Sequence, residues 1–153
     1  MARRLCYDAD MRLLGVDPGA RRIGLALSDP DGLIATPLST LSAANPLLAA
    51  RLVAAEAIRL QVEKIVLGLP LHLDGREGDA ARRSRLMAER LRALTALPVV
   101  LWDERLTTVA ADRALREGRV RGKKRKMLVD QVAAALLLQS YLDAERWQDD
   151  PDR

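Results

Sequence analysis

The stretch "LLGVDPGARRIGLALSD", residues 13–29, determines how the fold begins. Two apolar runs flank a four-residue connection, and that length favours an antiparallel hairpin with strands over 11–17 and 22–29. Asp17 ends the first of these strands with a carboxylate, and two arginines follow it closely. Asp-Pro-Gly is ordinary turn chemistry, so for Asp17 taken alone a role in the turn is the better interpretation.

Downstream of the hairpin, predicted strands alternate with helical segments. Asn45 is a helix N-cap followed by Pro46 at the first helical position, so a helix is predicted to run from there to about Leu60. Strand–helix–strand connections are right-handed and make their two strands parallel. The pattern therefore predicts an α/β fold: a mixed five-stranded sheet, three antiparallel strands and then two parallel ones, with helices packed on it. The other predicted elements are strands over 33–40, 64–69 and 99–105, and helices ending near Leu94 and spanning 108–117 and 126–146.

Carboxylates follow two of the strands whose ends should meet at one edge of this sheet. Parallel strands end at the same edge, where ligands bind in such folds. Asp17 ends the first strand, and Asp103 and Glu104 end the fifth. Because side chains alternate between the two faces of a strand, only one of Asp103 and Glu104 can face the site, and spacing alone does not decide which.

Asp130, in the long C-terminal helix, is the third candidate acid. It begins an apolar stripe at helical spacing, so it should face the protein rather than water. A carboxylate there is costly unless it is paired, hydrogen-bonded or bound to a metal. The alternative is a place in the first helical turn, where the helix dipole favours a negative charge. The stripe consists of Ala133, Ala134, Leu137, Leu138 and Tyr141.

Asp17, Asp130 and one acid of the Asp103–Glu104 pair would form a site with oxygen ligands only. Such ligands suit Mg²⁺ or Mn²⁺, and the sequence has no cysteine or histidine cluster that would favour zinc. A pair of these ions about 4 Å apart could hold the attacking water and the leaving oxygen of a phosphodiester, with Asp17 bridging them. No site for an organic cofactor is predicted.

Cations cluster in "REGRVRGKKRK", residues 116–126, where seven of them stand against the single anion Glu117. A solvated loop is the usual explanation for such a run. Cations are unfavourable at the start of a helix, however, so a phosphate partner would explain their position. Arg21 and Arg22 would also hold phosphate, with a surface salt bridge as the alternative. The predicted nucleic-acid-binding residues of the run are Arg119, Arg121, Lys123, Lys124, Arg125 and Lys126.

The amino-acid composition limits the kinds of protein that this chain can be. The 153 residues are 49% apolar, enough to bury the core of one domain, which we place at 11–146 between an N-terminal extension, 1–10, and a polar tail, 147–153. No apolar run is long enough to cross a membrane, so no membrane association is expected. The single cysteine, Cys6, makes a reducing cytoplasm the default. Aromatic residues are only 3%, which argues against a surface that stacks unpaired bases.

Four blocks of the sequence resemble the signature blocks of the YqgF family: "GVDPGARRIGLALSD", "GLPLHLDGREG", "VVLWDERLTT" and "KMLVDQVAAALLLQSYLD". The resemblance covers nearly the whole chain after its first ten residues. It implies a ribonuclease H-like fold, a divalent metal, and Asp17, Glu104 and Asp130 as catalytic metal ligands, which favours Glu104 over Asp103. Members of this family resemble Holliday-junction resolvases and are described as nucleases of pre-16S ribosomal RNA.

The resemblance implies an endonuclease that acts on structured nucleic acid, either branched DNA or precursor ribosomal RNA. It also implies a substrate-binding role for Arg105. A junction resolvase makes two paired cuts, so a homodimer is expected, although no heptad or exposed apolar face assigns its interface. One alternative is a nucleic-acid-binding or ribosome-assembly factor without catalysis. Another is an ATPase of the actin and sugar-kinase type, disfavoured because one domain cannot enclose a nucleotide. Met11 is the expected initiator, because the similarity starts there.

Overall fold

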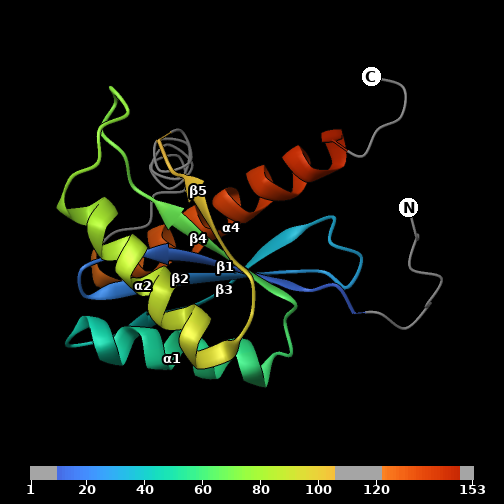
Figure 1. The fold of residues 1–153 in the computed structure, drawn as a ribbon, viewed down its shortest axis with the longest axis horizontal. Helices are drawn as coiled ribbons and strands as arrows, with labels where there is room; N and C mark the ends of the chain where they lie inside the picture. The colour runs from blue at the N-terminus through green and yellow to red at the C-terminus, as the bar shows by residue number, and fades with distance from the viewer. Residues whose placement is uncertain (1–9, 106–121, 149–153) are drawn as a thin grey trace.

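The computed structural model describes residues 10–105 and 122–148, except for the side chain of Lys123. Its strands are β1 Leu13–Pro18, β2 Arg22–Ser28, β3 Ala35–Ser42, β4 Lys64–Leu69 and β5 Val99–Asp103, and its helices are α1 Pro46–Arg59, α2 Asp79–Thr95 and α4 Gly122–Gln148. The strands form one sheet in the order β3-β2-β1-β4-β5 (Figure 1). β1, β2 and β3 pair antiparallel, whereas β4 runs parallel to β1, and β5 to β4. The predicted mixed sheet is confirmed.

Apolar side chains fill both faces of this sheet. Leu14 and Val16 of β1 are buried against α1 and α2, whereas Leu13 points to the opposite face and packs with Leu138 of α4. In Figure 1, α1 and α2 accordingly lie on one side of the sheet and α4 crosses the other. Asn45 caps α1 as predicted, since its Oδ1 accepts the Leu48 amide at 2.9 Å. No helix in the described ranges has the length and apolar character needed to cross a membrane.

Helix α4 begins at Gly122, earlier than the predicted start at residue 126. Lysine and arginine are good helix formers, so the described end of the basic run, residues 122–126, forms the first residues of the helix. Asp130 therefore lies in the third turn of α4, and the explanation of this acid by the helix dipole is wrong. The same helix continues through Gln148, so it includes the first two residues of the predicted polar tail.

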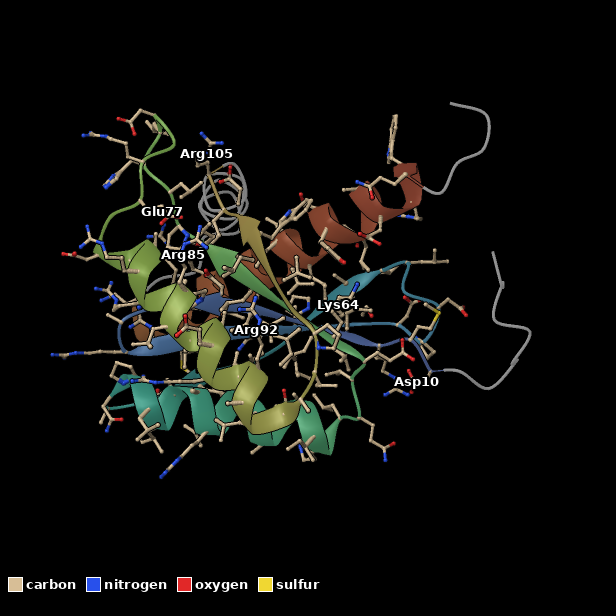
Figure 2. The ribbon with its side chains drawn as sticks, in the orientation of Figure 1. Asp10, Lys64, Glu77, Arg85, Arg92 and Arg105 are labelled. Carbon is tan, nitrogen blue, oxygen red and sulfur yellow. The ribbon has the colours of Figure 1, made fainter. Side chains whose placement is uncertain are left out.

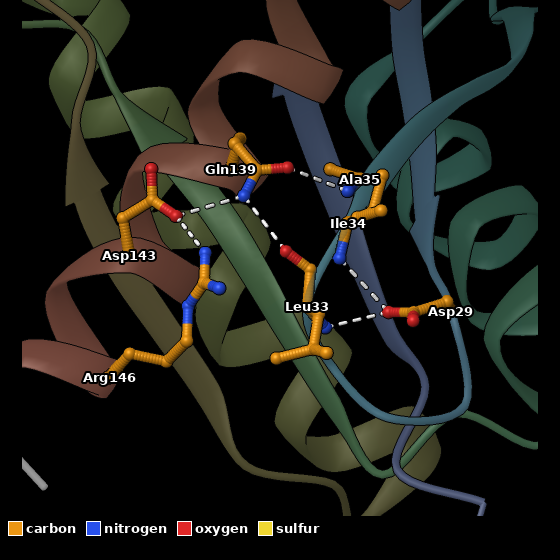
Figure 3. A network of polar contacts seen from close by, with 7 residues as sticks. All are labelled: Asp29, Leu33, Ile34, Ala35, Gln139, Asp143 and Arg146. Carbon is orange, nitrogen blue, oxygen red and sulfur yellow. Dashed lines mark hydrogen bonds and ion pairs between the residues drawn. The ribbon is translucent and has the colours of Figure 1, made fainter.

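The turn between β2 and β3 shifts the third strand to Ala35–Ser42, two residues later than predicted. Asp29 causes the shift, because its carboxylate accepts the amides of Leu33 at 2.6 Å and Ile34 at 3.0 Å and so keeps both residues in the turn (Figure 3). β1 likewise begins two residues late, at Leu13, and β5 ends at Asp103 rather than at residue 105. The predicted helix over 108–117 lies outside the described residues.

Hydrogen bonds fix α4 to the β2–β3 hairpin at two points. Gln139 accepts the Ala35 amide and donates to the Leu33 carbonyl, both at 2.9 Å (Figure 3). Nearer the start of the helix, the Thr40 hydroxyl donates to the Met127 carbonyl at 2.7 Å. The basic first turns of α4 are therefore held beside the β2–β3 hairpin.

Candidate active site

Asp17 and Glu104 meet at the carboxyl-terminal edge of the sheet, on the face that α4 covers. Asp17 ends β1, and Glu104 follows β5, where its amide donates to the Leu69 carbonyl at 3.3 Å. The two carboxyl groups share a hydrogen bond, and Glu104 is buried. Asp103 lies on the other face of the strand and pairs with Arg105 at 2.6 Å. Strand alternation left open whether Asp103 or Glu104 faces Asp17, and in the structure it is Glu104.

Two glycines make room for these acids. Gly24 of β2 lies opposite Asp17 in register, and a Cβ there would come within 1.9 Å of the Asp130 main-chain oxygen. A Cβ at Gly68 of β4 would come within 1.9 Å of Glu104 Oε1. Neither position tolerates a side chain without movement of its neighbour. The carboxylates and the third turn of α4 therefore lie directly on the strand backbones.

Burial and mutual repulsion raise the pKa values of both acids of the pair. Burial raises the pKa of Glu104 to about 10, and the hydrogen bond to Asp17 and the charge of Asp17 contribute to the rise. Burial also raises the pKa of Asp17, against the lowering effect of the hydrogen bond from Glu104; the charge of Asp130 adds to the rise. Two carboxyl groups in such contact share one proton, which relieves their mutual repulsion.

Asp130 approaches this pair from α4 but is bound to another partner. Arg22 Nε donates to Asp130 Oδ2 at 2.9 Å, and the Asp130 side chain is 19% exposed. The salt bridge offered as the alternative role of Arg22 is therefore present, although it lies in the site and is half-buried. Among the described residues, no three acidic, histidine or cysteine side chains lie within reach of one ion. The structure brings two of the three predicted acids together and leaves the third beside them.

The donor chemistry nevertheless fits a hard divalent cation. Asp17 and Glu104 present carboxylate oxygens in contact, and Asp130 is near enough for its charge to act on Asp17. Oxygen ligands of this kind are those that Mg²⁺ and Mn²⁺ take. A cation would also replace the proton that now relieves the repulsion between the two buried groups.

A hollow of about 330 Å³ lies next to Asp130, where β2 begins and α4 starts. Arg22, Arg125 and Lys126 line it, together with Gly122 and Val129. Three predicted nucleic-acid-binding cations are thus brought together beside the acids. Of the others in the run and the hairpin, Arg21 and Lys124 are exposed, while Arg119, Arg121 and the side chain of Lys123 lie outside the described part of the chain.

A second hollow, of about 150 Å³, gives access to Glu104 from outside. Pro70, Leu71 and Leu73 line it with Glu104 and Arg105. Figure 2 shows Arg105 at the same end of the molecule as the Glu77–Arg85 ion pair, and Asp10 toward the opposite end. Arg105 therefore stands at the entrance to the acid pair, although its guanidinium is bound to Asp103.

Sequence reasoning missed Thr40 and the two glycines. Thr40 sits in a strand whose pattern gives no sign that it would contact α4. Gly24 and Gly68 stand in apolar runs, where an isolated glycine does signal a close approach of another group. That signal was present for both glycines, and it could have located the acids.

A family model described as "RuvX: Holliday junction resolvase" matches residues 11–144. Three curated relatives share the name "Putative pre-16S rRNA nuclease". The protein from Protochlamydia amoebophila is 45% identical, covering 87% of this chain and 93% of that one. The one from Listeria monocytogenes is 44% identical, covering 87% and 98%. The one from a Nocardioides species is 49% identical, covering 87% and 88%.

Solved structures of two resolvases share the fold. The Thermus thermophilus RuvC in complex with a Holliday junction substrate has a TM-score of 0.60 at 15% identity, covering 90% of this chain and 96% of that one. The fowlpox virus resolvase in complex with Holliday junction DNA has a TM-score of 0.57 at 13% identity, covering 88% and 99%. The expected ribonuclease H-like fold is confirmed.

Proposed function

Because the chain belongs to the RuvX family of Holliday junction resolvases, which is also called YqgF, we propose that it is a divalent-metal-dependent endonuclease acting on structured nucleic acid. The observation that carries the proposal is the contact between Asp17 and Glu104 at the edge of the sheet. A buried acid pair of this kind is costly to a fold and is therefore typical of a catalytic site.

The position of each of the three acids indicates its role in metal binding. Asp17, Glu104 and Asp130 would hold Mg²⁺ or Mn²⁺, as one ion or two. When bound, such ions supply an activated water and stabilise the leaving oxygen of a phosphodiester. Asp17 is hydrogen-bonded to Glu104 and feels the charge of Asp130, so it would be the acid common to both contacts of the site. Glu104 must give up its proton before it can act as a ligand, so its raised pKa makes metal binding favour higher pH.

The cations of the hollow bind the backbone of the substrate. Arg125 and Lys126 lie in the first turns of α4, within the same hollow as Arg22. Phosphates held there would place the neighbouring backbone over the acid pair. Arg105 at the other entrance would hold the strand on the far side of the acids. Such contacts supply affinity and position but do not read sequence.

The substrate is either a four-way DNA junction, after which the family is named, or 16S precursor RNA, after which the curated relatives are named. Phosphate contacts do not separate DNA from RNA. Cleavage of the two substrates by the same preparation distinguishes them. Paired cuts in a junction would further require a homodimer, which light scattering of the protein with and without junction DNA would detect. A cytoplasmic location remains a prediction from the sequence.

Substitution of neighbouring acids tests the catalytic assignment. Glu104→Gln should reduce the cleavage rate by at least about 10²-fold, because it removes a ligand charge while leaving the shape of the site unchanged. Asp103→Asn is the matched control, since Asp103 is the next residue but points to the opposite face. It should keep most of the wild-type rate. Equal rates for the wild type and Glu104→Gln would contradict the assignment.

A second candidate function is nucleic-acid binding without cleavage. The ion pair between Arg22 and Asp130 favours it, because it occupies a carboxylate that a three-acid metal site needs. Purified wild type that binds junction DNA and precursor RNA, but cuts neither in Mg²⁺ or Mn²⁺, would support this function over the nuclease.

A further inference from the structure

Arg22 belongs to two features at once. Its Nε holds Asp130 at 2.9 Å, and its side chain also lines the basic hollow with Arg125 and Lys126. The Arg22 side chain is 39% exposed, about twice the exposure of Asp130 at 19%. Its guanidinium is therefore accessible from the hollow while it is bound to the acid.

The charges of the site are partly neutralised without a metal ion. Asp17 and Glu104 share a proton, and Asp130 has the guanidinium of Arg22. A half-buried ion pair such as Arg22–Asp130 is costly to break when one partner is left unpaired. The pair can be broken at little cost when each of its two residues gains a new partner of opposite charge. Phosphate is such a partner for Arg22, since the guanidinium fork matches phosphate oxygens.

We propose that Arg22 is a switch between substrate and metal: it holds Asp130 back from Asp17 and Glu104 until a backbone phosphate in the basic hollow takes its guanidinium. The freed Asp130 then joins the other two acids around a divalent ion. The proposal rests on the proposed nuclease function and adds its regulation. The switch explains two features of the site. Asp130 is bound to Arg22 instead of to the acid pair, and Arg22 also lines the basic hollow.

The switch makes phosphate and metal binding reciprocal. If a phosphate in the hollow raises the affinity for the ion, the ion must raise the affinity for nucleic acid by the same factor. Loss of the guanidinium then has two consequences. The bare protein should bind the ion more tightly without Arg22, and a duplex should no longer change its affinity for the ion. Removal of any cation beside the acids favours the ion electrostatically, so the lost effect of the duplex is what distinguishes a switch from a merely structural arginine.

The test is Mn²⁺ binding measured by calorimetry, with and without a linear DNA duplex, which supplies phosphates but no junction to cut. The duplex should tighten Mn²⁺ binding to the wild type by a factor within the usual coupling range, about 5–150-fold. Arg22→Gln should bind Mn²⁺ more tightly than the wild type in the absence of duplex, and the duplex should no longer change its affinity. Arg22→Lys keeps the charge without the fork and should fall between them.

Arg12→Gln is the control, because Arg12 makes the same kind of pair with Asp10, at 2.9 Å, at the opposite end of the molecule (Figure 2). It should behave as the wild type. If Arg22→Gln does not fold by circular dichroism, the Arg22→Lys measurement decides. Equal or weaker Mn²⁺ binding by the folded Arg22 variants without duplex would overturn the switch alone. No Mn²⁺ binding by the wild type, with or without duplex, would overturn the proposed function as well.

Discussion

At the scale of single residues, the acid pair shows what burial does to a carboxyl group. Glu104 is buried against the partly buried Asp17, and the pair keeps a proton that an exposed glutamate would lose. Asp103, the neighbour of Glu104 in the chain, faces outward, and its hydrogen bond from Arg105 lowers its pKa. Adjacent acids on one strand therefore have opposite electrostatic roles.

The raised pKa of Glu104 predicts a pH dependence of stability. Between its usual value and about 10, the folded state binds one proton more than the unfolded state, so in EDTA the free energy of unfolding should fall as pH rises. The limiting slope for one proton is about 1.4 kcal/mol per pH unit. Glu104→Gln should lose this slope in urea unfolding measured from mildly acidic to mildly alkaline pH. An identical slope in the variant would contradict the prediction.

The two glycines of the site should respond differently to alanine. At Gly24 the new methyl group meets the Asp130 main chain, so α4 itself must move, and overpacking of this kind costs about 1–3 kcal/mol of stability. At Gly68 it meets the end of the Glu104 side chain, which can turn away. Gly68→Ala should therefore cost less stability in urea unfolding while weakening Mn²⁺ binding. A larger loss of stability for Gly68→Ala than for Gly24→Ala would be inconsistent with the packing.

At the scale of elements, α4 connects the site to the hairpin that supports it. Its first turns carry the cations, its third turn carries Asp130, and its later turns pack against the sheet through Leu138 and Tyr141. Hydrogen bonds of Thr40 and Gln139 fix two levels of the helix to β3. The sequence predicted the helix and its apolar stripe from periodicity, but not its start, because basic residues propagate a helix without marking where it begins.

Thr40→Val should loosen the start of α4. The substitution keeps the shape of the side chain but removes the hydrogen bond to the Met127 carbonyl, which is worth about 1 kcal/mol. Hydrogen exchange of amides in the first turns of α4 should become faster, while amides near Gln139 keep their rates. Thr36→Val, at an exposed position of the same strand, is the control and should leave both rates unchanged. Unchanged exchange in Thr40→Val would show that this contact does not hold the helix.

At the scale of the whole molecule, the fold was predictable wherever signals were local. The hairpin at Asp17, the cap at Asn45 and the crossover rule together gave the confirmed sheet. The site was predictable only in part. The choice of Glu104 over Asp103 came from family resemblance, because alternation along a strand leaves the facing side open until the sheet is packed. The Arg22–Asp130 pair joins residues 108 positions apart, and no local pattern predicts such a contact.

The assembled molecule therefore places an acid pair, a third acid held by an arginine and a basic hollow side by side at one edge of a sheet. A crystal structure of the protein soaked in Mn²⁺ together with a DNA duplex would show whether this acid set binds divalent ions. Anomalous density is expected between Asp17 and Glu104, with Asp130 turned from Arg22 toward the ion. Mn²⁺ found only elsewhere, with the two carboxyl groups still hydrogen-bonded to each other, would contradict metal binding by this acid set.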